Sequence, residues 1–212
     1  MSGTKGTVDR FHRLYYDADV QSNTFWLGHD VVKTPNDLWV VQEILYETRP
    51  ELIIETGVFK GGSALYYAHI LDLIGIECDI LSVDIMYDET FPYPEHERIE
   101  FVLGMSSIDP AVLRIAREKA KGKRTMVILD SDHSCDHVLQ ELRAYAPLVS
   151  KGCYLVVEDT NVNGYPVMPL YGPGPMEAVK AWQPKNHGFE VDKTREKFML
   201  TFHPGGWLKR VR

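Results

Sequence analysis

The feature that most constrains the fold is an alternation of short apolar runs with amphipathic stretches between residues 51 and 160. The apolar runs are "ELIIETG", "CDILSVDI", "IEFVLGMSS", "RTMVILDSD" and "CYLVVED". Stretches with helical spacing of apolar residues separate most of them, such as "GGSALYYAHILDLIG" and "DPAVLRIAREKAKG". Strands that alternate with helices predict right-handed βαβ units and a parallel sheet. The runs are nearly continuous in Val, Ile and Leu, as expected of strands covered on both faces.

The flanking segments complete the predicted architecture. Thr34 or Asn36 can cap a helix that ends before Pro50, and a second helix is expected at residues 175–182. The segment "GFEVDKTREKFMLTF" predicts two short strands across a charged turn, with the last pair antiparallel. We therefore predict a doubly wound α/β fold with a mostly parallel seven-stranded sheet, helices on both faces and an antiparallel C-terminal hairpin. Residues 1–35 are predicted to form a lid or substrate segment, and residues 36–212 the main domain.

Composition excludes several classes of protein. The 212 residues carry a formal net charge of −7, which disfavours nucleic acid and anionic lipid as partners. Three cysteines without CxxC spacing argue against a disulfide framework and for a reducing compartment. The N-terminus lacks the apolar region of a secretory signal, and no run is long enough to span a membrane. We expect a cytoplasmic protein.

A glycine-containing loop, "ETGVFKGGS" (residues 55–63), follows the first predicted strand. Gly57 permits a tight turn, and Gly61 and Gly62 let a ligand approach the backbone at the start of a helix. The loop matches neither a phosphate-binding P-loop nor GxGxxG, and its leading Glu55 would suit an ammonium group. The alternative is a plain strand-to-helix turn. Asp84, at the end of the second predicted strand, favours the ligand-binding interpretation.

This combination resembles motif I of class I S-adenosylmethionine-dependent methyltransferases. In that family an acidic residue and the glycine loop hold the methionine part of the cofactor, and a carboxylate after the second strand holds the ribose. The segment "GMSS" matches the one that lines the adenine. The resemblance implies that S-adenosylmethionine contacts Glu55, Gly57, Lys60, Gly61, Ser63, Asp84, Ser106, Asp130 and Asp132.

Acidic residues end two further strands, "LDSDH" and "VED". Because these strands are neighbours in a sheet of this type, Asp130, Asp132, Glu158 and Asp159 are expected to converge. Clustered carboxylates stay ionised only beside a cation, and hard oxygen ligands favour Mg²⁺, with Ca²⁺ or Mn²⁺ as alternatives. Taken singly, "ED" could be a solvated strand end, and "DSDH" a helix cap. His133 has the pKa range of a general base, although a structural role remains open.

The segment "LDSDHSCDHVLQELRAYAPLVSKGCYLVVEDTNVNG" resembles the cephalosporin hydroxylase (CmcI-like) and rhamnosyl O-methyltransferase group, which is related to macrolide sugar and catechol O-methyltransferases. The resemblance implies Mg²⁺ ligation by Asp130, Glu158 and Asp159, with His133 as base. Catechol-type enzymes have Asp-Asn after the fifth strand, where this chain has Glu158, Asp159 and Thr160, so the pair can be aligned at either of two positions. No 2-His-1-carboxylate set is evident, so we expect methyl transfer rather than hydroxylation.

The expected reaction is Mg²⁺-dependent methylation of a small-molecule hydroxyl, on a sugar or polyhydroxylated natural product. A catechol substrate, a noncatalytic cofactor-binding protein and a metal-dependent hydrolase are the alternatives. Homo-oligomerisation is left open. Aromatic residues are expected to stack on the substrate or, equally, to pack the N-terminal segment or form a dimer contact; they are Tyr15, Tyr16, Trp26, Tyr165 and Tyr171.

Overall fold

The computed structural model describes residues 2–212 and contains a seven-stranded sheet. Its strands lie in the order β5-β4-β3-β6-β7-β9-β8, and the first five are parallel to one another. Their bounds are β3 Leu52–Thr56, β4 Asp79–Asp84, β5 Ile99–Leu103, β6 Thr125–Leu129, β7 Tyr154–Val157, β8 Phe189–Val191 and β9 Trp207–Arg210. The predicted doubly wound, mostly parallel architecture is confirmed.

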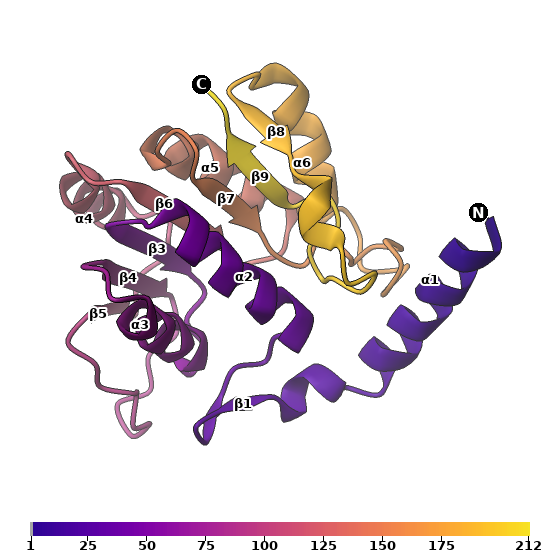
Figure 1. Cartoon of the computed structure of the whole chain (residues 1–212), viewed down its shortest axis with the longest axis horizontal. Coiled ribbons are helices and arrows are strands. Elements are labelled where there is room, and N and C mark those ends of the chain that lie inside the picture. Colours follow the sequence, from indigo (N-terminus) through magenta and orange to yellow (C-terminus); the bar gives the residue numbers. More distant parts are fainter. Residues whose placement is uncertain (1) are drawn as a thin grey trace.

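Helices cover both faces of this sheet (Figure 1). In the view of Figure 1, α2 and α3 lie in front of the sheet and α4 and α5 behind it, and α6 packs against α5. Their bounds are α2 Pro35–Thr48, α3 Gly62–Ile74, α4 Pro110–Ala120, α5 Cys135–Tyr145 and α6 Pro175–Trp182. Short 3₁₀ turns occupy Val20–Asn23, Ala146–Leu148, Gln183–Lys185 and Lys193–Glu196.

The central strands form the core because helices shield them from both sides. Every residue of β3, β6 and β7 is buried, which is why these strands contain so few polar side chains before their last residues. The α2 helix begins as predicted, with Thr34 accepting a hydrogen bond from the backbone N–H of Asn36. No helix among residues 2–212 is both long and apolar enough to cross a membrane.

The C-terminal hairpin is antiparallel, but its predicted second strand is wrong. The strand β8 pairs with β9, whereas residues 197–202 form no strand. The physical reason is that residues 201–206 run beside the turn after β7 and bond to it instead. Phe202, for example, accepts a hydrogen bond from the backbone N–H of Asn161 through its carbonyl oxygen.

The N-terminal segment contains a long helix that the sequence analysis did not predict. This helix, α1 (Ser2–Asp17), extends to the side of the body in Figure 1 and is followed by a small hairpin of β1 (Phe25–Trp26) and β2 (His29–Asp30). The α1 residue His12 is buried, stacks on Phe202 and lies 3.0 Å from the side-chain nitrogen of Asn161. These contacts bring the segment to the carboxyl ends of the strands.

Candidate active site

A cavity of about 560 Å³ opens at the carboxyl ends of the parallel strands. Its wall comes from residues 31–34 of the N-terminal segment, the loop after β3, the end of β4, the turns after β5, β6 and β7, and residues 202–203. The predicted site residues that line it are Gly57, Ser63, Asp84, Ser106, Asp130, Asp132, His133, Glu158 and Asp159. These predicted residues come from the ends of five different strands, β3 to β7, and they share one cavity.

Asp84 organises the glycine loop. Its Oδ2 accepts hydrogen bonds from the backbone N–H groups of Val58 (2.7 Å) and Phe59 (2.8 Å), and Oδ1 accepts one from Met86 (2.7 Å). Gly57 has a φ of +84°, and a Cβ at this position would lie 1.8 Å from the carbonyl oxygen of Asp130. Only glycine fits there, so the loop is held close against the turn after β6.

Three of the predicted cofactor residues are not part of the cavity wall. Glu55 is fully buried behind it and accepts a hydrogen bond from Ser82 (2.9 Å), and burial raises its pKa to about 7. Lys60 forms an ion pair with Asp30 in the N-terminal segment (2.7 Å). Gly61 lies in the left-handed region directly before α3.

Asp132 and Ser106 line the cavity, and each also accepts a hydrogen bond within its own turn. Asp132 accepts a hydrogen bond from the backbone N–H of Ser134 (2.8 Å), which lowers its pKa. Ser106 accepts a longer one from the backbone N–H of Ile108 (3.4 Å). Both interactions stabilise the turns that precede α5 and α4.

The acidic strand ends converge as the register of the sheet requires. The strands β6 and β7 are parallel neighbours, and Leu129 is paired with Val157. Asp130 and Glu158 are the next residues of these strands, so their side chains leave the sheet together. Glu158 is 4% exposed, and the pKa of this carboxyl is raised well above its ordinary value by burial and by the negative charge of Asp130.

The cation between these two carboxylates in this structure is Lys33. Its Nζ lies 2.6 Å from Oδ2 of Asp130 and 2.5 Å from Oε2 of Glu158. Burial opposes the charge on Lys33, but Asp130 and Glu158 together keep its pKa well above the usual value. The preceding Val32 has a φ of 56°, a strained conformation for a β-branched residue. The strain indicates that surrounding contacts hold Lys33 in place.

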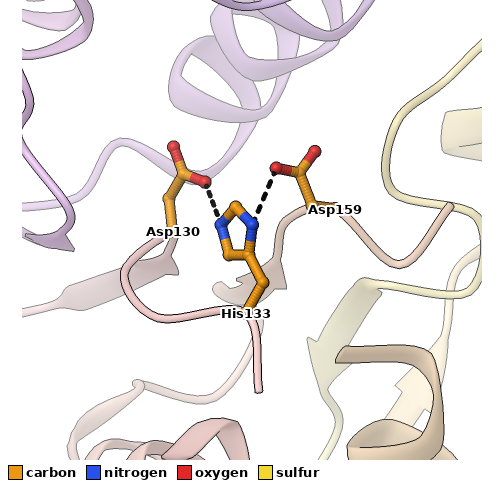
Figure 2. A group of neighbouring side chains, drawn as sticks. All are labelled: Asp130, His133 and Asp159. Carbon is orange, nitrogen blue, oxygen red and sulfur yellow. Dashed lines mark hydrogen bonds and ion pairs between the residues drawn. The ribbon is translucent and has the colours of Figure 1, made fainter. Parts of the chain in front are cut away.

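His133 lies between the other pair of carboxylates, as Figure 2 shows. Its Nε2 is 3.3 Å from Oδ1 of Asp130, and its Nδ1 is 3.3 Å from Oδ2 of Asp159. Although burial disfavours the charged ring, the two carboxylates raise its pKa to about 9. Ligand atoms of these three residues lie within 4.8 Å of one another, close enough to share a metal ion.

Sequence reasoning missed two residues of this cluster, Lys33 and His203. The side chain of His203 is buried, and its Nε2 lies 3.6 Å from a carboxylate oxygen of Asp37 and 3.6 Å from one of Glu158. Neither residue stands in a motif. Lys33 follows a hairpin, and His203 comes directly after the segment that was predicted to form the last two strands, so no pattern indicated either.

The aromatic residues considered for substrate contact lie in different surroundings, and only some of them are near the cavity. Tyr15 and Tyr16 pack against Phe202, which lines the cavity. Burial, together with the negative charge of Asp159, raises the pKa of Tyr16. Trp26 donates a hydrogen bond to His69 instead. The ammonium nitrogen of Lys180 lies 4.1 Å from the centre of the Tyr165 ring. Tyr171 is partly exposed near the acidic cluster.

Known proteins resemble this chain over almost all of its length. The model of the rhamnosyl O-methyltransferase/CmcI family matches residues 18–211. The rhamnosyl O-methyltransferase of Mycobacterium tuberculosis (strain ATCC 25618 / H37Rv) is 41% identical over 96% of this chain and 84% of its own length. The rhamnosyl O-methyltransferase of Mycobacterium leprae (strain TN) is also 41% identical, over 98% of this chain and 92% of its own length. A solved structure of CmcI with Mg and S-adenosylmethionine shares the fold, with a TM-score of 0.68, 22% identity, and coverage of 90% of this chain and 78% of that one.

Proposed function

The chain belongs to the rhamnosyl O-methyltransferase/CmcI family, and from this membership we propose that it transfers the methyl group of S-adenosylmethionine to a hydroxyl of a sugar. The curated relatives named above are rhamnosyl O-methyltransferases, which supports a deoxysugar as acceptor. The observation that carries the proposal is the cavity that joins the glycine loop and Asp84 to the acidic cluster around His133.

The glycine loop and Asp84 form the cofactor side of the proposed site. Asp84 would accept hydrogen bonds from the ribose hydroxyls, since it lies at the end of β4 where such a carboxylate can reach both. Gly57 lets the glycine loop lie directly against the backbone of Asp130, which places the cofactor side of the site next to the acidic cluster. The proposed cofactor set is completed by Glu55, Lys60, Gly61, Ser63, Ser106, Asp130 and Asp132. Of these, Glu55, Lys60 and Gly61 would act from outside the cavity wall.

Asp130, Glu158 and Asp159 are the proposed ligands of Mg²⁺. Their hard carboxylate oxygens fit this ion, and two of the carboxylates already share a cationic partner. When bound, the ion would supply Lewis-acid polarisation of the acceptor hydroxyl. Because Lys33 currently balances Asp130 and Glu158, the proposal requires its ammonium to give up that position.

His133 is the proposed general base. Its ring faces the cavity and is oriented on both sides by Asp130 and Asp159. A ring with a pKa of about 9 is protonated at neutral pH, so the role of base requires a neutral ring, and a divalent ion on Asp130 and Asp159 would offset the negative charge that raises this pKa. The acceptor O–H bond then breaks as its proton passes to the free nitrogen of neutral His133, and the flanking carboxylates stabilise the imidazolium that results. The oxygen then forms a bond to the methyl carbon, and the electron pair of the C–S bond stays on sulfur. Alignment of these two reactants is the main contribution of the cavity.

The N-terminal segment, residues 1–35, is proposed to close the acceptor side. Tyr16 of α1 donates a hydrogen bond to Sδ of Met168, which links the helix to the loop after β7. The same segment supplies Lys33 to the acidic cluster. An acceptor sugar entering beside Asp159 would therefore meet the aromatic side chains of α1.

The test is methyl transfer from radiolabelled S-adenosylmethionine to rhamnosides, with and without Mg²⁺, by the wild type and Asp159→Asn. The proposal predicts Mg²⁺-dependent transfer that falls at least a hundredfold in the variant. Asp136→Asn is the matched control, because Asp136 lies in the first turn of α5 and outside the cavity wall. If neither EDTA nor the Asp159→Asn substitution lowers the rate of methyl transfer, the metal-dependent mechanism is refuted.

A further inference from the structure

The turn that carries Asp159 is aligned by a neighbouring segment, residues 201–206. The two segments run side by side beyond the end of the β7–β9 pairing, and Gly206 allows their close approach because a Cβ there would lie 2.1 Å from the carbonyl oxygen of Val157. The hydrogen bonds between them run from Val157 N to Gly206 O (2.9 Å), Asp159 N to His203 Nδ1 (3.2 Å), Thr160 Oγ1 to Pro204 O (2.9 Å) and Asn161 N to Phe202 O (3.2 Å).

The bond to His203 differs from the others because it uses a side chain as acceptor and falls on the strained residue. Asp159 has a φ of 51°, in the left-handed region that residues with a Cβ seldom occupy. Such a conformation persists only where neighbouring contacts hold it. Its backbone N–H is fixed by Nδ1 of His203, and that fixes the direction in which the Asp159 carboxylate leaves the chain.

The ring of His203 is itself oriented. Nδ1 can accept a hydrogen bond only when it carries no proton, so in the neutral ring the proton resides on Nε2. Nε2 faces carboxylate oxygens of Asp37 and Glu158, each 3.6 Å away, which favour a proton there. The ring also packs edge-on against Trp207, with centroids 5.2 Å apart. Charge and packing thus select the tautomer that Asp159 needs.

We propose that His203 is a positioning residue for Asp159: its Nδ1 holds the strained backbone of that residue so that the carboxylate points at the metal position and at His133. The inference rests on the proposed function, because it takes Asp159 as a metal ligand. His203 touches neither the metal position nor a reacting atom through this bond, and it acts through the backbone of the ligand.

Two substitutions of His203 separate this role from simple packing. In His203→Asn the side-chain oxygen stands near the position of Nδ1 and can still accept from Asp159, whereas in His203→Gln the amide extends toward the position of Nε2. The matched control is His187→Gln, because His187 is an exposed histidine outside the cavity wall. All proteins are compared for folding by circular dichroism and thermal unfolding.

Two readouts are measured on the full chain. Calorimetric titration with MnCl₂ gives the metal affinity, and hydrogen exchange of the Asp159 amide in metal-free protein reports the bond directly. We expect His203→Gln to weaken Mn²⁺ binding about tenfold or more and to speed exchange at Asp159, as loss of a residue that orients a ligand does. His203→Asn should stay within about threefold of the wild type in both.

Equal losses in the Asn and Gln variants, or unchanged Asp159 exchange in the Gln variant, would overturn the inference. If the wild type binds no divalent ion, the metal part of the proposed function fails. The amide exchange in metal-free protein still decides the positioning role in that case.

Discussion

Replacing Lys33 by methionine removes the buried cation and keeps a side chain of similar length. In the metal-free protein this leaves Asp130 and Glu158 facing each other without the ammonium that now lies 2.6 and 2.5 Å from them. Breaking a buried ion pair from one side costs about 3–5 kcal/mol. His133 still balances part of the charge on Asp130, so we take the lower end, about 3 kcal/mol.

For a chain of this size, about 3 kcal/mol corresponds to a fall in Tm of roughly 6–12 °C. The assay is thermal and urea unfolding of the wild type and Lys33→Met, each with EDTA and with saturating MgCl₂. Because a divalent ion need not displace an ammonium in the variant, Mg²⁺ should raise its Tm more than it raises that of the wild type. A ligand at a hundred times its Kd stabilises by about 2.7 kcal/mol, enough to recover most of the loss.

The matched control is Lys185→Met, since Lys185 is exposed and lies outside the wall of this cavity. It should change Tm by little, because exposed charges contribute little to stability. Two results would refute the reasoning. An undiminished Tm in Lys33→Met with EDTA would mean that the ion pair adds no stability, and an equal Mg²⁺ effect in both proteins would mean that Lys33 and the metal do not compete.

Three further predictions follow from the same geometry. Asp84→Asn should weaken S-adenosylmethionine binding at least about tenfold in calorimetry, because hydrogen bonds to a charged group contribute about 1.5–3 kcal/mol; an unchanged Kd would contradict the assigned role. His133→Asn should lower kcat by about 10²–10⁴ with little change in cofactor Kd, and a fall in cofactor affinity alone would assign His133 to binding. Burial raises the pKa of Glu55 from 4.5 to about 7, so the folded state binds the proton more tightly and loses this stabilisation as pH rises through that range. The free energy of unfolding of Glu55→Gln, measured with urea, should therefore rise by roughly 3 kcal/mol relative to that of the wild type between pH 4.5 and pH 8. A difference between the two proteins that does not change with pH would contradict the raised pKa.

The sheet could be predicted because each parallel strand is a local signal. The residues of β3, β6 and β7 are all buried and mostly apolar, and the glycine and acidic residues that follow them stand at positions set by the strand ends. The convergence of Asp130 with Glu158 follows from the same reasoning, since neighbouring parallel strands end at one edge. Their roles as metal ligands stay a prediction.

The C-terminal hairpin shows where local signals fail. Residues 197–202 have the apolar content of a strand, yet Phe202 at the end of this segment bonds to the turn after β7, and β9 begins only at Trp207. Pairing with segments distant in the sequence decides which of these residues form the last strand. The segment itself contains no signal for that choice.

What the sequence by itself determined was the layered fold, the edge of the sheet that carries the site, and the types of residue gathered there. These follow from periodicity and strand ends, which are properties of consecutive residues. Only the tertiary structure decided that Lys33 lies between Asp130 and Glu158, that His133 joins Asp130 to Asp159, and that His203 holds the backbone of Asp159. Those contacts join residues up to 125 positions apart, as Lys33 and Glu158 are, and long-range ion pairs leave no periodic trace in the chain.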